Sequence, residues 1–345
     1  MSLARAITTG DLTQLPSRRD EDWRWTDLRG LIRLLPAPSP AHIGAATPGP
    51  FASLADREIL IVNGRGPTAI KVAAGETQTL VLRFISAKDA GAHVARAAIE
   101  IGEGASLTLL ESYEGEGSDY VVERDLTISL AQDARLERVI MADDDQDAVS
   151  VSRADIDLSP AATLAQTVLA SGAKRQRLET HVTHPGAGAT VRLDGVYVLS
   201  AKRHADMTTV VTHAGAHGVT EQLTKGVVND QARGVFQGRI VVSPGADQTD
   251  ARMGHHALIL SDRAEVDAKP ELEIYADDVA CAHGNTVGAL DDEALFYARQ
   301  RGIAEAEARA MLTGAFLTEV IDRIAHDGAR DVARAWLATQ LGAWP

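Results

Sequence analysis

A cysteine and a histidine stand two positions apart near the C-terminal end of the chain, as Cys281-Ala282-His283. A thiolate and an imidazole are ligand types that suit iron, zinc or an iron–sulfur cluster. Residues two apart in a β-strand point to the same face, so both side chains could reach one site. Two ligands are too few for a closed metal site, so a metal would need carboxylates or a second chain.

Two alternatives for this pair stay open. Cys281 could pack as a small hydrophobic residue while His283 bonds to the backbone. A catalytic cysteine would need a base and a lowered thiol pKa. Negative charge nearby works against a thiolate, and the acidic residues of this stretch are Glu271, Glu273, Asp277, Asp278, Asp291 and Asp292. No Walker A motif, GxSxG or helix-opening GxGxxG occurs in the sequence, so we expect no ATP binding by the chain itself.

Composition excludes several classes of protein. The formal net charge of -14 repels phosphate backbones, so we expect no nucleic-acid binding. A single cysteine excludes internal disulfides and a four-thiolate cluster within one chain. The sequence has no apolar run long enough for a membrane span or a signal peptide. We therefore expect a cytoplasmic protein without membrane contact.

The long middle of the chain must position the Cys-x-His pair. From about residue 97, short apolar or alternating runs recur between turn residues, without a helical period. A weak repeat has alanines 29, 28 and 27 residues apart, at Ala105, Ala134, Ala162 and Ala189, with a poorer match at Ala216. Such a period predicts a β-solenoid whose stacked coils share one core. A β-sandwich with aligned turns is the alternative.

The two ends of the chain differ from the middle. Residues 1–95 read as a helical and mixed region with a proline-rich stretch at 36–50, and Ser17 is expected to cap a helix. After Gly288 the period is helical, with helices at about 291–301, 304–326 and 328–341. We predict three regions: 1–95, a β-helix core at 96–285 and a helical subdomain at 286–345. Tyr297 and Trp336 are expected to be exposed, so the last helices either cap the core or present a face to a partner.

Several segments together resemble the SufB/SufD family of scaffold subunits in SUF iron–sulfur cluster assembly. PELEIYADDVACAHGNTVGALDDEALFYARQRGI at 270–303 is similar to the family's C-terminal signature. LTKGVVNDQARGVFQGRIVV at 223–242 and GADQTDARM at 245–253 agree as well, and PSRRDEDWRWT at 16–26 resembles a SufD pattern. That pattern, the length and the lone cysteine favour the SufD branch over SufB. Departures from the family pattern occur at Ala282, Asn285 and Gly254-His255-His256, and we assign no role to the last three.

The resemblance implies a right-handed parallel β-helix flanked by helical regions, acting as a scaffold that is not an enzyme. It implies pairing with a SufB-like subunit near the C-terminal signature and docking of a SufC-like ABC ATPase on the C-terminal helices. The candidate contact residues there are Phe296, Tyr297, Arg301 and Phe316. ATP binding by that ATPase would pull on the helices after residue 286 and reshape the junction of the two scaffold subunits.

The same resemblance implies that His283 lies at the interface where a nascent iron–sulfur cluster forms transiently, with Cys281 as the neighbouring thiol. The isolated chain is expected to hold no cofactor. The sequence leaves open the cluster type and whether a reduced flavin binds the assembled complex. Two functions from other classes compete: a β-helix carbohydrate-active enzyme, which the 4% aromatic content disfavours, and a structural homodimer with no metal role.

Overall fold

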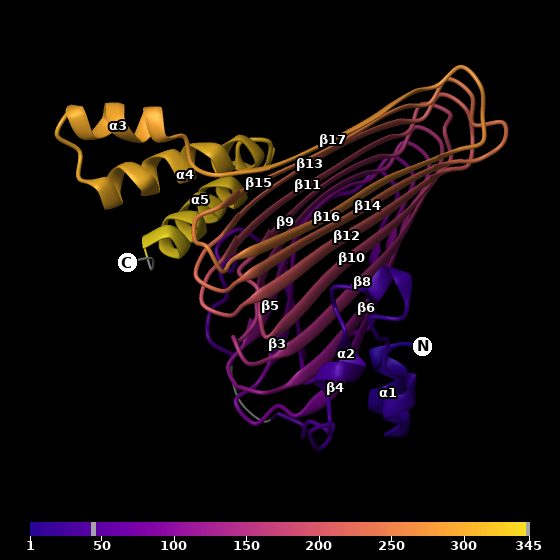
Figure 1. The fold of residues 1–345 in the computed structure, drawn as a ribbon. Coiled ribbons are helices and arrows are strands. Elements are labelled where there is room, and N and C mark those ends of the chain that lie inside the picture. Colours follow the sequence, from indigo (N-terminus) through magenta and orange to yellow (C-terminus); the bar gives the residue numbers. More distant parts are fainter. Residues whose placement is uncertain (43–45, 343–345) are drawn as a thin grey trace.

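A computed structural model describes residues 1–42 and 46–342, so residues 43–45 of the predicted proline-rich stretch lie outside it. The described residues form two parallel β-sheets, of nine and eight strands, with helices at both ends of the chain (Figure 1). Consecutive strands alternate between the sheets, and each pairs with the strand two positions away in sequence order. The chain therefore winds as a solenoid, which confirms the predicted mainly-β fold with a parallel β-helix core and C-terminal helices.

We call the two sheets the odd sheet and the even sheet after the numbers of their strands. The odd sheet contains β1 Arg57–Val62, β3 Thr77–Ser86, β5 Ser106–Gly115, β7 Arg135–Asp143, β9 Thr163–Ala170, β11 Thr190–Leu199, β13 Val219–Val228, β15 Asp250–Ile259 and β17 Ala280–Gly288. The even sheet contains β2 Ala69–Val72, β4 Ala92–Ile101, β6 Val121–Leu130, β8 Val149–Leu158, β10 Arg175–His184, β12 His204–His213, β14 Arg233–Val242 and β16 Glu265–Ile274.

The predicted alanine repeat marks one corner of the solenoid. Ala105, Ala134, Ala162 and Ala189 each lie one residue before an odd strand, and each is 0% exposed. The fifth member of the repeat was placed wrongly at Ala216. Thr190 pairs with Val219, so this position belongs to Gly218, because β11 is two residues longer than β9.

The solenoid interior is mostly aliphatic, but it also encloses a charged cluster. Arg138 donates to Glu111 Oε1 over 2.6 Å and to Gln166 Oε1 over 2.7 Å. Gln166 in turn donates to Thr180 Oγ1 over 3.0 Å. All four residues are buried. A buried charge is tolerated when it is paired and hydrogen-bonded, and this cluster meets that condition.

Two C-terminal helices cover the outer face of the odd sheet with their apolar sides. Helices α4 (Glu305–Ile321) and α5 (Asp327–Gly342) pack Leu317, Val320 and Trp336 against side chains of this sheet. Trp336 is 6% exposed, so the expectation that it would be exposed was wrong. Helix α3 (Asp292–Gln300) lies apart from the sheets in Figure 1 and buries only Leu295.

The N-terminal segment covers part of the outer face of the even sheet. It contains α1 (Leu3–Thr9), η1 (Leu12–Gln14), η2 (Glu21–Trp23) and α2 (Leu28–Leu31). In place of the helix predicted from Ser17 onward, the chain forms only the short elements η2 and α2. Asp20 accepts from the Ser17 amide and Asp27 accepts from the Gly30 amide, both over 2.8 Å. Aspartate side chains that bond nearby amides in this way compete with a continuous helix.

Strands β1, β2 and β3 lie within the region that we predicted to be separate, residues 1–95, but they belong to the same two sheets as the later strands, because β2 pairs with β4 and β3 with β5. The division into three regions stays a prediction. No helix in the described part of the chain is both long and apolar enough to span a membrane.

Candidate functional site at the open end of the solenoid

The last coil of the solenoid consists of β16 and β17. In the described residues, β16 pairs only with β14 and β17 only with β15, so each has one free edge. A free edge presents unpaired backbone N–H and C=O groups that can bind another strand. Strands of a partner could therefore form hydrogen bonds with the last coil and extend both sheets.

Cys281 and His283 lie together on β17. They are in register with Ala251 and Met253 of β15, which are 0% and 2% exposed. Residues in register on parallel strands point to the same face, so Cys281 and His283 face the solenoid interior. Cys281 is half-buried and packs at the edge of a cluster around Phe236, whereas His283 is exposed.

Apolar side chains accompany this pair at the open end. Ile274 of β16 is in register with buried Val242, and Val287 of β17 is in register with buried Ala257. Ile274 and Val287 are nevertheless 42% and 43% exposed, because the described chain stacks no further coil on them. The end of the solenoid thus exposes apolar residues at core positions, together with a thiol and an imidazole.

The environment of Cys281 does not activate its thiol. Burial is the main cause that raises the pKa of Cys281 above its usual value. A backbone hydrogen bond with Ala251 opposes this effect, and the Asp250 carboxylate adds to it. A nucleophilic cysteine needs a lowered pKa, so this geometry does not support the catalytic alternative.

Three of the acidic residues near Cys281 in sequence, Glu271, Glu273 and Asp291, have other partners. Glu271 and Glu273 contact Arg239, with N–O distances of 3.2 and 3.4 Å. Asp291 caps α3 and accepts from the Glu293 amide over 2.9 Å. Across residues 1–42 and 46–342, no group of three or more His, Cys, Asp or Glu side chains could hold a metal ion. Any cluster at Cys281 and His283 would need ligands from another chain.

A second histidine connects the core to the open end. His255 Nδ1 lies 2.7 Å from Asn285 Oδ1, and His255 Nε2 lies 2.9 Å from the Tyr197 hydroxyl. Because an amide oxygen only accepts, Nδ1 must donate and Nε2 must accept from the hydroxyl. The ring stacks on Phe236 with centroids 4.6 Å apart, and burial lowers the pKa of His255 to about 4. His255 and Asn285 both depart from the family pattern. They lie one coil of the solenoid apart in sequence, and this spacing could have predicted their contact.

The predicted docking residues fall into two places. Phe296 and Tyr297 are 63% and 61% exposed on α3. Arg301, at the C-terminal end of that helix, donates to the Tyr297 hydroxyl over 2.7 Å. Phe316 is half-buried on α4, with the Lys225 ammonium 4.4 Å from its ring centroid. Three of the four residues thus form one exposed group, and the fourth packs against β13.

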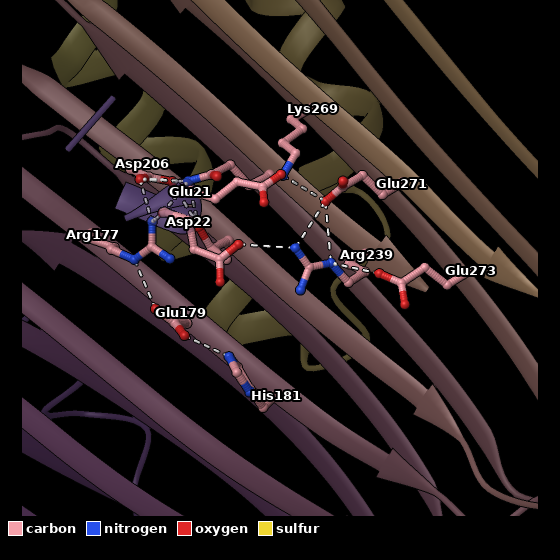
Figure 2. Close-up of polar contacts among 12 residues, drawn as sticks. Glu21, Asp22, Arg177, Glu179, His181, Asp206, Arg239, Lys269, Glu271 and Glu273 are labelled. Atoms are coloured by element: carbon pink, nitrogen blue, oxygen red, sulfur yellow. Dashed lines mark hydrogen bonds and ion pairs between the residues drawn. The ribbon is translucent and has the colours of Figure 1, made fainter. Parts of the chain in front are cut away.

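A polar cluster on the outer face of the even sheet was missed at the sequence level (Figure 2). Arg177 donates to Asp206 Oδ2 over 2.7 Å and to the Asp22 carbonyl oxygen over 2.7 Å. His204 lies on the same face of β12 as Asp206, and His204 Nε2 is 3.1 Å from the Trp25 carbonyl oxygen. These contacts join residues 29 to 179 positions apart, so no local pattern could reveal them.

Residues 84–316 match a family model described as "SUF system FeS cluster assembly, SufBD core domain". The match runs from β3 to α4 and covers more than half of the chain, including Cys281 and His283. The chain belongs to the SufBD family.

Named relatives agree with this membership. The chain is 28% identical to "Iron-sulfur cluster assembly protein SufD" of Escherichia coli, over 95% of this chain and 90% of the relative. It is 32% identical to the SufD protein of Bacillus subtilis, over 39% of this chain and 31% of the relative. It is 34% identical to a SufBD family protein of Synechocystis, over 44% of this chain and 34% of the relative. This SufBD protein therefore has a role in iron–sulfur cluster assembly.

Proposed function

We propose that this SufBD protein is a scaffold subunit without catalytic activity of its own. It pairs with a SufB-type subunit through the open end of the solenoid, and a SufC-like ABC ATPase docks on its C-terminal helices. One observation carries the proposal: Cys281 and His283 face the core, yet the last coil leaves them uncovered. The family membership disfavours the carbohydrate-active alternative.

Strand addition is the physical basis for the pairing. Free edges of β16 and β17 would gain main-chain hydrogen bonds from the edge strands of a partner. The same contact would remove Ile274 and Val287 from water, which favours association. A second copy of the chain offers the same kind of edge, so a homodimer of the isolated chain competes with the heteromeric pair.

The nascent cluster would be the cargo of this interface. His283 would supply an imidazole ligand to iron, and the partner subunit would supply most of the remaining ligands. Cys281 is the neighbouring thiol, and its raised pKa favours the protonated form until a metal binds. Burial of the interface by the partner would then shield the growing cluster from water.

The helical subdomain would transmit motion along two routes. One is the direct chain connection from β17 to α3. The other is the attachment of the region after α4 to the odd sheet, where Arg323 contacts Asp194 at 3.2 Å and Glu221 at 2.9 Å. Lys225 of β13 also pairs with Glu319 of α4. An ATPase acting on the exposed residues of α3 would therefore move β11 and β13 as well as the last coil.

Substitution of His283 tests the proposed site of the nascent cluster. We expect His283→Ala to leave folding and complex formation intact, because the side chain is exposed. Cluster assembly in cells that depend on this protein should fall by about tenfold or more, as is typical when metal-site groups are lost. The matched control is His42→Ala, at an exposed histidine outside the sheets. Full assembly activity in His283→Ala would remove this residue from the mechanism.

Co-purification tests the partners. The wild-type protein should retain both a SufB-type subunit and the ATPase. Val287→Asp places a charge in the uncovered core, so we expect it to release the SufB-type subunit but keep the ATPase. Retention of the SufB-type subunit by this variant would contradict docking through the open end, and purification of wild type only as a homodimer would favour the structural alternative.

A further inference from the structure

Residues 17–27, which we call the N-terminal strap, cross the outer face of the even sheet. The Asp22 carbonyl oxygen accepts from Arg177 of β10 over 2.7 Å and from Gln237 of β14 over 3.2 Å. Thr26 donates to Asp206 of β12. The strap thus bonds to three neighbouring strands before it reaches the last coil, as Figure 2 shows for Asp22.

The inner part of the strap is firmly anchored. The side chains of Arg177 and Asp206 are 1% and 0% exposed, and the Arg177 guanidinium lies 4.4 Å from the centroid of the Trp23 ring. The strap contains only the three-residue turn η2 as regular structure. Its position therefore depends on these contacts with the sheet and not on a helix of its own.

The outer part of the strap reaches the last coil through ion pairs. Glu21 Oε1 lies 2.8 Å from Lys269 Nζ of β16. Asp22 Oδ1 lies 3.0 Å from Arg239 of β14, which also contacts Glu271 and Glu273 of β16 (Figure 2). Glu21 and Asp22 are mainly exposed, so these pairs are weak and sensitive to salt.

The last coil is where such a restraint has most effect. Strand β16 has a neighbouring strand on one side only, among the residues described, so it is held less firmly than β10 or β12. We infer that Glu21 and Asp22 are positioning residues, which hold β16 in the geometry that a partner strand binds. This inference rests on the proposed docking function, because it assigns β16 to the docking edge.

Amide hydrogen exchange tests the restraint without any partner. In the full chain carrying Glu21→Gln and Asp22→Asn, exchange in β16 and β17 should become about threefold to tenfold faster, as expected for two exposed ion pairs. Exchange in β6 and β8 should stay unchanged. In 1 M salt, where screening acts within about 3 Å, the difference between variant and wild type should disappear.

The matched control is Glu100→Gln, which breaks another exposed 2.8 Å ion pair of the even sheet, with Lys71, at the far end of the solenoid. It should leave β16 and β17 unaffected. With the co-purified SufB-type subunit as probe, the strap variant should bind about threefold to tenfold more weakly, while Glu100→Gln binds like wild type.

Two results would overturn the inference. Unchanged exchange in β16 would show that the strap does not restrain the last coil, and would leave the docking proposal standing. Faster exchange with unchanged partner affinity would show that the restraint does not serve docking. Failure of the docking proposal itself would appear separately, as retention of the SufB-type subunit by Val287→Asp.

Discussion

Strands β15 and β17 share a register but differ in environment. Ala251 and Met253 of β15 are buried, whereas Cys281 and His283 occupy the matching positions of β17 and are half-buried and exposed. The difference is that, among the residues that the structure describes, β15 has a strand on both sides and β17 has one on a single side. Side chains at inward positions thus become accessible where the stack of coils stops.

The comparison extends to how polar groups are satisfied. In the middle of the solenoid, Arg138 and Glu111 satisfy each other inside one chain. Near the open end, both ring nitrogens of His255 have hydrogen-bond partners, Tyr197 and Asn285, whereas His283 is exposed to solvent. Substitutions in the middle should therefore lower stability, and those at the end should alter binding.

The largest effect is expected from the charged cluster in the interior. Glu111→Ala leaves Arg138 buried without its carboxylate, which should lower the free energy of unfolding by about 3–5 kcal/mol. Chemical denaturation would measure this loss. The control is Asp250→Ala, which removes an exposed 3.2 Å ion pair with Arg252 on β15 and should cost less than about 1 kcal/mol. Equal losses in the two variants would contradict the contrast between interior and surface.

A smaller loss of folding stability is expected when the pH is lowered. Burial lowers the pKa of His255 to about 4, against an ordinary value near 6.5. Between these values the unfolded chain binds more protons than the folded one, so stability is complete above pH 6.5 and falls as the pH drops toward 4. This residue should contribute about 2–3 kcal/mol to that fall.

Denaturation curves across this pH range would test the contribution of His255. His255→Gln should flatten part of the dependence. The remaining dependence would come from other groups whose pKa is shifted by burial. Burial lowers the pKa of His93, His184, His204 and His213, which adds to the fall. It raises the pKa of Glu123 and Asp194, which opposes the fall because these carboxyls bind protons more readily in the folded state. An unchanged slope in His255→Gln would show that this ring is not held neutral by burial.

The smallest effect concerns the thiol at the open end. Because burial raises the pKa of Cys281, iodoacetamide should alkylate it more slowly at pH 7 than a cysteine in a short peptide. The rate should rise toward a midpoint at higher pH than that of the peptide. A bound SufB-type subunit should slow alkylation further. A midpoint below that of the peptide would indicate an activated cysteine. It would contradict the interpretation that the last coil exposes core positions without activating the thiol.

Much of the architecture could be predicted from local signals. Alanine before each of four odd strands marked the coil period, because a small side chain fits a tight corner of the stack. The first C-terminal helix, predicted at about 291–301, is confirmed: Asp291 accepts from backbone amides at its start, and Gly302 follows its end at a φ of 85°. The burial of Trp336 was missed because a helical pattern does not say which sheet its apolar face will meet.

For the candidate site, the sequence by itself determined that Cys281 and His283 share one face of a strand, since the spacing of two residues requires it. It also determined the coil period that stacks them. Only the tertiary structure decided that this face points to the core, that no further coil in the described chain covers it, and that Glu21 reaches Lys269 across 248 residues. The reason is physical: strand and turn preferences act between neighbours, whereas burial and ion pairing depend on which distant segments the stacked coils bring together.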